Sequence, residues 1–475
     1  MSKTKLGIGG LFLLLTASAV VFYFAVLYYG LQLIAPEREI AFVRSTGIQA
    51  NILGLVMIAL AVITFSSRLL GVIGEQWFAQ PLVIGEILTG ILLGPSLLGA
   101  VAPAVSHLVF PSQVLPAIGI VANIGVVLFM FVIGLEIDAM ALRRSSRPTI
   151  IVSHASIILP FLLGTLLSLY LYPRYGRGDV SFTAFSLFFG VSLSLTAFPV
   201  LARILKEQQV QRTPLGLTAL ACAALNDVTA WALLALVVGI VTADVRGAMT
   251  TVPSLIAYLA VMFVIVRPAF QWLSRRVEQA DAPPSMLILT TVIVGLLLSA
   301  ATTEMIGIHA LFGAFLFGVF LPHDGKLTHA LRERIEDLVA ILFLPAFFAF
   351  TGLRTQIGLL SGIGDWAVCG LIILVATIGK FGGSYCAARY AGLGRRESSA
   401  LGVLMNTRGL VELIVLNVGL DLGILSPKMF AMMVIMALVT TLMTSPIFSI
   451  LKRGLNLNAA FDATPRPKAG QLASM

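Results

Sequence analysis

The sequence predicts an all-α membrane protein with about 13–14 transmembrane helices, built as inverted repeats with two broken crossing helices. Three observations lead to this fold class. Of the 475 residues, 58% are hydrophobic and 11% are charged, and the mean hydropathy is +1.00, a balance that soluble domains do not show. The chain holds about fourteen apolar stretches of the length that crosses a hydrocarbon core. Two of these stretches are interrupted by polar residues at matching positions in two halves of the chain.

The expected spans follow one another along the chain with short loops between them. They cover residues 11–34, 49–70, 82–98, 114–137, 149–172, 181–205, 214–242, 254–275, 285–303, 307–321, 338–356, 363–391, 398–420 and 428–451. With both termini in the cytoplasm, most loop Lys and Arg residues fall on the inner side, as Arg143, Arg275 and Arg396 illustrate. We therefore expect an integral protein of a bacterial inner membrane, with a disordered cytoplasmic tail over residues 452–475.

The N-terminal segment, residues 1–48, is expected to form an extra transmembrane helix and a loop. Its basic start and the small residues Ala17–Ala19 also match a cleavable signal peptide. The apolar run continues to Ala35, which favours an uncleaved helix. Cleavage would instead leave about thirteen spans and place the N-terminus outside.

The sequence lacks the motifs of common enzymes, so we expect neither enzymatic activity nor a cofactor. It has no His-Glu-x-x-His zinc site, no Gly-x-Ser-x-Gly elbow and no Walker loop. The net charge of +9 does not indicate nucleic acid, because the basic residues lie in short loops and not in one patch. Without an ATP-binding domain in this sequence, an ion gradient has to drive transport, which leaves a secondary transporter or a channel.

One span, 181–205, contains a strong helix breaker. Pro199 removes a backbone hydrogen bond and its ring clashes with the preceding turn. The hydroxyl residues Ser194 and Thr196 stand just before it. A kink or a break is therefore expected, with Thr196 deep in the membrane.

A second span, 398–420, is interrupted at its centre by residues 406–409, which combine a charge, two polar side chains and a glycine. Each interrupted span is the middle of a triplet of spans, residues 149–242 and 363–451. Paired broken helices in two halves of a chain are typical of inverted-repeat transporters, which bind their substrate where the helices break.

Asp227 is the strongest candidate for ion binding. It stands in the middle of span 214–242, close to the bilayer midplane. A carboxylate there costs several kcal/mol unless it is paired, protonated or hydrated, which makes a functional role the preferred interpretation over a purely structural one. The neighbouring Asn226 offers a neutral carbonyl oxygen, a suitable ligand for a hard monovalent cation.

Lys380 occupies the corresponding depth of span 363–391, flanked by Gly379, Gly382 and Gly383, which allow another helix to approach closely. Its ammonium needs a partner, and Asp227 is the most natural one. The pair would then titrate as a coupled unit. The alternative is a static buried salt bridge that only holds the helices together.

For the other intramembrane polar residues, and for Pro199, we expect structural roles. Arg408 is expected where the carbonyl ends of half-helices converge, and Glu412, one turn later, is its expected ion-pair partner. Scaffold and ion-pathway roles stay open for this pair. The role of Glu86 in span 82–98 is not separated from a structural hydrogen bond, and His309 is interpreted as a hydrogen-bonding residue at a helix end.

Several motifs in matching order make a family resemblance specific. They are Pro81–Leu88, Gly94–Gly99, Phe129–Glu136, Ala224–Asp227, Lys380 and Met405–Glu412. Together they resemble the second monovalent cation:proton antiporter family, and the last motif is especially similar to the plant cation/proton exchanger branch. The resemblance covers nearly all of residues 50–451.

The resemblance implies a homodimer and a division of each protomer. Dimerisation-domain helices are expected over 49–137 and 285–356, a mobile core over the triplets 149–242 and 363–451, and a linker helix over 254–275. It also implies that Asp227 binds cation and proton in turn, with Thr196 and Asn226 in the same site and Lys380 as the mid-membrane partner.

Two departures from the family limit what carries over. Family members often have a long nucleotide-binding or regulatory tail, which this sequence lacks, so no regulatory nucleotide partner is expected. The electrogenic bacterial members carry two adjacent aspartates where this sequence has Asn226 and Asp227, which leaves the stoichiometry open. The main hypothesis is an antiporter that exchanges Na⁺ or K⁺ for H⁺. A cation channel and a sodium-coupled solute symporter are the alternatives.

Overall fold

The computed structural model describes residue 25 and residues 52–78, 82–136, 147–211, 213–242, 245–279, 283–306, 309–322 and 325–453. Within these ranges all regular elements are helices, which confirms the predicted fold class. Among the described residues, ten helices are long and apolar enough to cross a membrane, and two apolar helices, α9 (Phe182–Ser194) and α15 (Ala310–Phe320), are shorter. The predicted N-terminal span 11–34 and almost all of the predicted tail lie outside the described residues.

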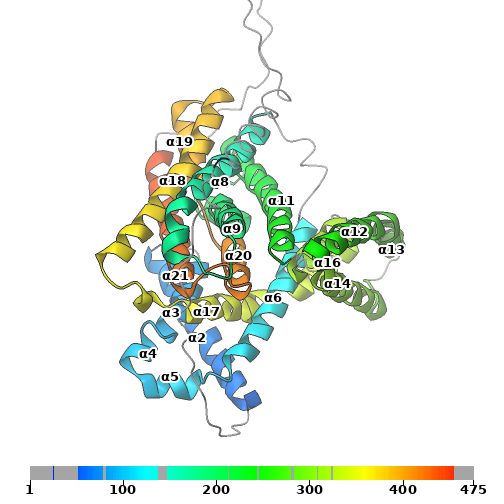
Figure 1. The fold of residues 1–475 in the computed structure, drawn as a ribbon. Coiled ribbons are helices and arrows are strands. Elements are labelled where there is room, and N and C mark those ends of the chain that lie inside the picture. Colours follow the sequence, from blue (N-terminus) through cyan, green and yellow to red (C-terminus); the bar gives the residue numbers. More distant parts are fainter. Residues whose placement is uncertain are drawn as a thin grey trace, which may run out of the picture.

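The helices of the two predicted triplets pack against each other (Figure 1), and we call them together the core. The first comprises α8 (Arg147–Tyr175), α9, α10 (Phe198–Glu207) and α11 (Pro214–Thr242). The second comprises α18 (Ile363–Tyr390), α19 (Arg395–Met405), α20 (Leu410–Asp421) and α21 (Pro427–Lys452).

We call the helices within residues 52–136 and 245–354 the scaffold. They are α2 (Ile52–Phe78), α3 (Leu82–Leu93), α4 (Leu98–Val101), α5 (Pro103–Val109), α6 (Leu115–Glu136), α12 (Val245–Val261), η1 (Met262–Val266), α13 (Arg267–Gln279), α14 (Met286–Ile306), α15, α16 (Lys326–Leu338), η2 (Val339–Phe343) and α17 (Leu344–Arg354). The short η3 (Ile357–Leu359) connects the scaffold to the second triplet.

Thirteen of the predicted spans correspond to helices or runs of helices in the described chain, and several boundaries differ: α2, for example, ends at Phe78 and not at residue 70. Span 82–98 is too long, because α3 ends at Leu93 and the chain continues into the short helices α4 and α5. Gly94 and Pro95 follow α3 directly, and the residue before a proline is disfavoured in the helical region. The linker segment α12 to α13 runs from Val245 to Gln279 and is therefore longer than predicted.

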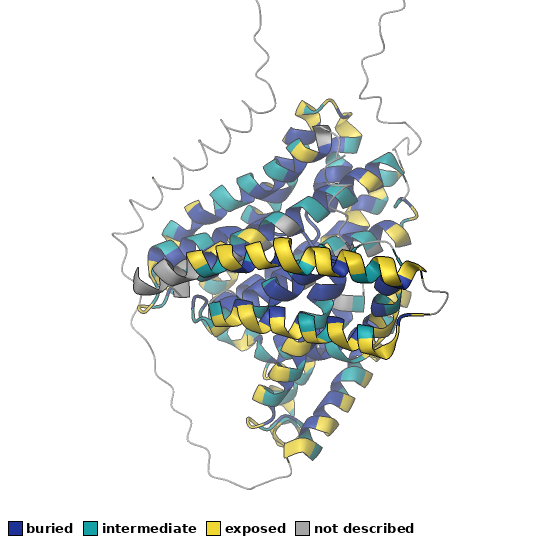
Figure 2. Ribbon diagram, turned by 90° about the vertical axis from the view of Figure 1, so that its right-hand side faces the viewer, coloured by how far each residue is buried: buried dark blue, intermediate teal, exposed yellow. Residues whose placement is uncertain are grey.

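The scaffold helices α12 to α14 form the edge of the molecule that faces the viewer in Figure 2. Their outward side chains are large and apolar, and Val264, Leu287 and Leu298 are all exposed. Surface of this kind is stable against lipid and not against water, so this edge fits the integral membrane protein that the composition predicts.

Both predicted helix breaks are present, and they cross each other. Residues 195–197 are extended between α9 and α10, and Pro199 is the second residue of α10, a position where its missing N–H costs nothing. Residues 406–409 separate α19 from α20. The two connections touch where the Ala197 N–H donates to the Thr407 carbonyl oxygen at 3.1 Å.

Glycine allows the two triplets to pack closely through α8 and α18. A Cβ added at Gly379 would stand 2.8 Å from Cα of Pro160, and one added at Gly383 would stand 2.6 Å from the carbonyl oxygen of Ala155. Two of the three glycines that flank Lys380 thus serve the predicted close approach. Gly382 does not, because its nearest neighbour, in the Leu159 side chain, is 3.8 Å away.

Scaffold helices α3 and α17 are in backbone contact at Gly352, which yields a first prediction. A Cβ at this position would lie 2.6 Å from backbone atoms of Ile87, Gly90 and Ile91. We expect Gly352→Ala to lower the free energy of unfolding by about 1–3 kcal/mol, because backbone has to move to accept the methyl group. The measurement is the apparent melting temperature of the purified protein in detergent.

Gly370→Ala is the matched control for this substitution. Gly370 is also helical, but no atom lies within 4 Å of the added Cβ. The control is expected to leave the melting temperature unchanged or slightly higher, since alanine favours helix over glycine. Equal melting temperatures for both variants would contradict tight α3–α17 packing.

Candidate functional site

Four charged side chains are buried where the broken helices cross, and they are the fully buried charges of the described ranges. Asp227 lies on α11, Lys380 on α18, Arg408 in the connection between α19 and α20, and Glu412 on α20. Their exposed fractions are 1%, 0%, 0% and 1%. Two acids and two bases balance each other, so with all four ionised the cluster buries no net charge.

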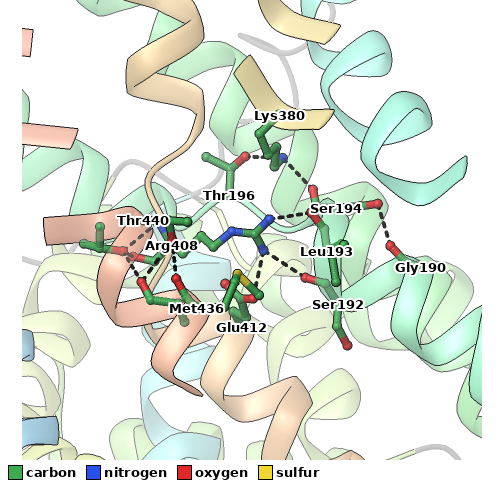
Figure 3. Close-up of polar contacts among 12 residues, drawn as sticks. Gly190, Ser192, Leu193, Ser194, Thr196, Lys380, Arg408, Glu412, Met436 and Thr440 are labelled. Atoms are coloured by element: carbon green, nitrogen blue, oxygen red, sulfur yellow. Dashed lines mark hydrogen bonds and ion pairs between the residues drawn. The ribbon is translucent and has the colours of Figure 1, made fainter. Parts of the chain in front are cut away.

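The carbonyl end of α9 is bound by both cations (Figure 3). The Arg408 guanidinium donates to the carbonyl oxygens of Ser192 at 3.1 Å and Leu193 at 2.7 Å. The Lys380 ammonium donates to the next carbonyl, that of Ser194, at 2.5 Å. The last carbonyls of a helix have no partner within the helix and carry its negative dipole end, so these cations neutralise the break.

The ion pair expected between Arg408 and Glu412 is present, with Nη1 and Oε1 2.8 Å apart. Glu412 lies in the first turn of α20, where the helix dipole also favours a negative charge. The backbone of Arg408 is held by Thr441, whose hydroxyl accepts from its N–H at 3.1 Å and donates to its carbonyl at 2.8 Å. These contacts favour a structural role for Arg408 and Glu412 over a role in the ion pathway.

The Asp227 carboxylate differs from the other three charges because no described side chain pairs with it. Among the described residues, neither of its oxygens makes a hydrogen bond of good geometry. It faces the start of α10, where the backbone N–H of Phe198 lies close to the carboxylate. A buried carboxylate without a partner is costly, so this group requires a proton or a cation.

Lys380 does not form the expected direct ion pair with Asp227. Its ammonium is held instead by the Ser194 carbonyl and by the Thr196 hydroxyl, whose Oγ1 is 2.6 Å from Nζ. Lys380 and Asp227 influence each other only through space. The physical reason is that the last carbonyl groups of α9, which have no partner within the helix, attract the Lys380 ammonium. The sequence alone does not indicate this contact.

Asn226 lies beside Thr196 and two serines of α8. Its amide atoms are 2.7 Å from Oγ of Ser153, 2.8 Å from Oγ of Ser156 and 3.2 Å from Oγ1 of Thr196. The sequence analysis placed Asn226, Asp227, Thr196 and Lys380 in one site, but it did not include the two serines. Their three-residue spacing, which puts both hydroxyls on one helix face, is the signal that was available.

Two further residues of the prediction lie away from the crossing. Glu86 is half-buried on α3 and belongs to the scaffold. His309 directly precedes α15, and its Nδ1 is buried without a hydrogen-bond partner in the described chain.

A cavity of about 900 Å³ separates the core from the scaffold on one side of the crossing. Phe198 and Lys206 of α10 line it from the core, and Glu75 of α2 and Glu336 of α16 line it from the scaffold. Lys206 lies in a predicted cytoplasmic loop, so the cavity opens inward under the predicted topology. One of its lining residues, Phe198, is also the residue whose backbone lies next to the Asp227 carboxylate.

On the predicted outer side, polar contacts join the core to the scaffold. Arg354, the last residue of α17, donates to Oδ1 of Asn417 at 3.1 Å and to Oδ1 of Asp421 at 2.5 Å, both on α20. Asn417 in turn donates to the Thr351 hydroxyl of α17 at 2.7 Å. The sequence prediction missed this cluster, because its members lie in separate spans about 60 residues apart.

Similarities to known proteins extend over the scaffold and both triplets. Residues 56–452 match a family described as sodium/hydrogen exchanger, transmembrane. The chain is 43% identical over 399 residues to the Na(+)/H(+) antiporter NhaS4 of Synechocystis sp., covering 84% of this chain and 97% of that protein. It is 39% identical over 413 residues to cation/H(+) antiporter 17 of Arabidopsis thaliana, covering 86% of this chain and 50% of the plant protein.

A solved structure shares the fold. The sodium proton antiporter MjNhaP1 from Methanocaldococcus jannaschii matches with a TM-score of 0.59 at 16% identity, over 85% of this chain and 99% of that one. At 16% identity this similarity indicates a shared arrangement of helices and nothing more.

The buried contacts of Arg408 yield a second prediction. Arg408→Met leaves Glu412 charged and two carbonyls of α9 unbound in the membrane, so we expect a loss of about 3–5 kcal/mol in stability. The fall in apparent melting temperature in detergent measures it. Arg332→Met is the control, because Arg332 pairs with Glu336 at the same spacing and the same 2.8 Å, with side chains 42% and 50% exposed.

The control is expected to lose less than about 1 kcal/mol, as exposed ion pairs do. If the two variants melt at the same temperature, Arg408 does not hold the crossing together.

Proposed function

The chain belongs to the sodium/hydrogen exchanger family, and we propose that it is a secondary active antiporter that exchanges a monovalent cation, Na⁺ or K⁺, for H⁺ by alternating access. Cation and proton compete for the Asp227 carboxylate. The observation that carries this proposal is the buried position of that carboxylate, with neither oxygen hydrogen-bonded among the described residues. The other three buried charges of the described chain form hydrogen bonds or an ion pair with neighbouring groups. Asp227 is therefore the one that can bind a proton or a cation reversibly.

Charge balance supports exchange at this site. With Asp227 protonated, Lys380 and Arg408 outweigh Glu412 by one positive charge. With Asp227 ionised and a monovalent cation bound, the cluster again carries one positive charge. A buried cluster that holds the same charge in both loaded forms crosses the membrane at equal electrostatic cost in either direction.

Alternating access is supported by the contrast between the two sides of the core. The cavity beside α10 brings open space close to the site on the predicted inner side, and the cluster of Arg354, Asn417 and Asp421 joins core to scaffold on the outer side. In the proposed cycle the outer contacts break when the core moves against the scaffold. The homodimer expected through helices within 49–137 and 285–356 stays a prediction.

The first test of the proposal is Asp227→Asn. The amide is neutral, so it neither releases a proton nor attracts a cation, and we expect exchange to be abolished while the protein stays folded. The measurement is dequenching of a pH-sensitive dye in proteoliposomes on addition of Na⁺ or K⁺. In the wild type, the half-saturating cation concentration should rise by up to about tenfold for each unit that the pH falls, as competition by mass action requires.

Asp179→Asn is the control, because it removes an acid that is 54% exposed in the loop between α8 and α9, outside the buried site and outside the outer cluster. It should retain cation-dependent proton flux. Wild-type flux in Asp227→Asn would exclude this carboxylate as the binding site.

The stoichiometry yields a further prediction. One titratable carboxylate next to Asn226 allows one proton to leave per cation, so we expect 1:1 electroneutral exchange. The measurement is Na⁺-driven proton flux in liposomes whose membrane potential is clamped with valinomycin at several values. A rate that climbs steadily with potential would show that a second group, for which Lys380 is the candidate, also releases its proton.

A further inference from the structure

The cavity beside α10 has charges of opposite sign on its two walls. Lys206, in the last turn of α10, is the charged residue that the core contributes to the lining in the described chain. Glu75 of α2 and Glu336 of α16 are the charged residues that the scaffold contributes there. All three residues are exposed. The core therefore presents a base to this space, and the scaffold presents two acids.

The contact between core and scaffold on the predicted outer side has the reverse arrangement of charge. There the base, Arg354, belongs to the scaffold and the acid, Asp421, belongs to the core, with their side chains 2.5 Å apart. The outer pair is formed in this structure, whereas the inner walls are separated by a cavity of about 900 Å³. The core thus has an acid on the predicted outer side and a base on the predicted inner side, and the scaffold has an opposite charge facing each.

Closure of the inner cavity would remove Lys206 from water. A buried ammonium without a partner is costly, and an acid on the opposite wall offsets that cost. Glu336 lies on this opposite wall, and Val339, Ala340 and Leu344, which follow it in the chain, line the cavity with it. The charges on the two walls therefore permit the closure that alternating access requires.

Glu336 can exchange its present partner without a large loss. It pairs with Arg332 of the same helix at 2.8 Å, with side chains 50% and 42% exposed. Exposed ion pairs of this kind contribute little to stability. A lysine that approaches as water leaves the cavity can therefore replace Arg332.

We propose that Lys206 and Glu336 form an inner gate. They pair across the cavity when the core closes it, and they separate when the core opens it again. Arg354 and Asp421 separate on the other side as the inner pair forms. Each state is then held by one ion pair between core and scaffold, so neither state is strongly favoured, as a cycle between two states requires. This inference rests on the alternating access of the proposed function, and it assigns a role to two residues outside the ion site.

The first test reverses the two charges in the full chain, in proteoliposomes. Lys206→Glu places acids on both walls, so we expect the maximal exchange rate to fall on the order of fivefold, because closure is disfavoured. The half-saturating Na⁺ or K⁺ concentration should not rise, since Asp227 and its neighbours are unchanged. Glu336→Lys should have a similar effect. The double variant, Lys206→Glu with Glu336→Lys, should return to within about twofold of the wild-type rate, because the pair is restored with reversed signs.

Arg395→Glu is the control for a general loss of positive charge. Arg395 is an exposed base at the start of α19, on the same predicted inner side, and it does not line the cavity. This substitution changes the charge by the same amount as Lys206→Glu. The maximal rate of the control should stay within about twofold of the wild type.

A second measurement shows whether the two walls meet. Lys206→Cys and Glu336→Cys are combined and oxidised in a Cys386→Ser background, because Cys386 is exposed and the other two cysteines are buried. A disulfide needs Cα atoms within about 7 Å, so its formation shows that the walls have approached. It should stop exchange until it is reduced. Lys206→Cys with Asp337→Cys is the control that should not crosslink, because Asp337 is exposed on α16 but does not line the cavity.

The readouts separate this inference from the proposed ion site. Disulfide formation depends on movement of the core and not on the carboxylate, so it should persist in Asp227→Asn. If Asp227→Asn still exchanges, the proposed site fails while the gate stands. The gate is wrong if Lys206→Glu keeps the wild-type rate, if the double variant is no faster than Lys206→Glu, if Arg395→Glu slows exchange equally, or if the pair at 206 and 336 does not crosslink.

Discussion

The ends of two broken helices inside a bilayer impose the constraint on which the rest of this structure depends. Each break leaves carbonyl and N–H groups without helical partners, and in hydrocarbon no water replaces them. The protein meets this cost by crossing the breaks and by burying cations against the carbonyl end of α9. Arg408 and Lys380 are therefore in the membrane for a structural reason first, and the remaining charges follow from them.

Once two cations are buried, two anions are needed to balance them, and the structure treats these anions differently. Glu412 is paired with Arg408 at 2.8 Å and occupies the start of α20. Asp227 faces the start of α10 with both oxygens free of hydrogen bonds in the described chain. The difference arises because Lys380 is occupied by Ser194 and Thr196. The ion exchange that we propose needs one buried charge that is balanced by the other charges but has no direct ion-pair partner, and Asp227 meets this requirement.

The contacts between core and scaffold suit movement of one against the other. Within the scaffold, α3 and α17 touch backbone to backbone, and within the core, α8 and α18 do the same, so these two helix pairs are tightly packed. Between the bodies, a cavity lies on one side and the polar cluster of Arg354, Asn417 and Asp421 on the other. Polar contacts that exchange for water on separation hold less firmly than packed apolar surface, and the cycle that we propose requires such a reversible contact.

The sequence by itself predicted the fold class, nearly all spans and both helix breaks, and it singled out the four residues that we propose as the ion site. It did so because lipid imposes strict rules: a polar or helix-breaking residue at mid-span is too costly to be incidental, so Pro199, Asp227, Lys380 and Arg408 stand out individually. The end of α3 was misplaced because apolar residues continue past the turn at Gly94. Only the tertiary structure decided which charges meet. Lys380 binds the end of α9 and not Asp227, and Ser153, Ser156 and Arg354 join polar clusters that sequence patterns did not reveal. Pairing depends on distances between helices that are remote in the chain, and hydropathy reports the depth of a residue in the membrane but not its neighbours.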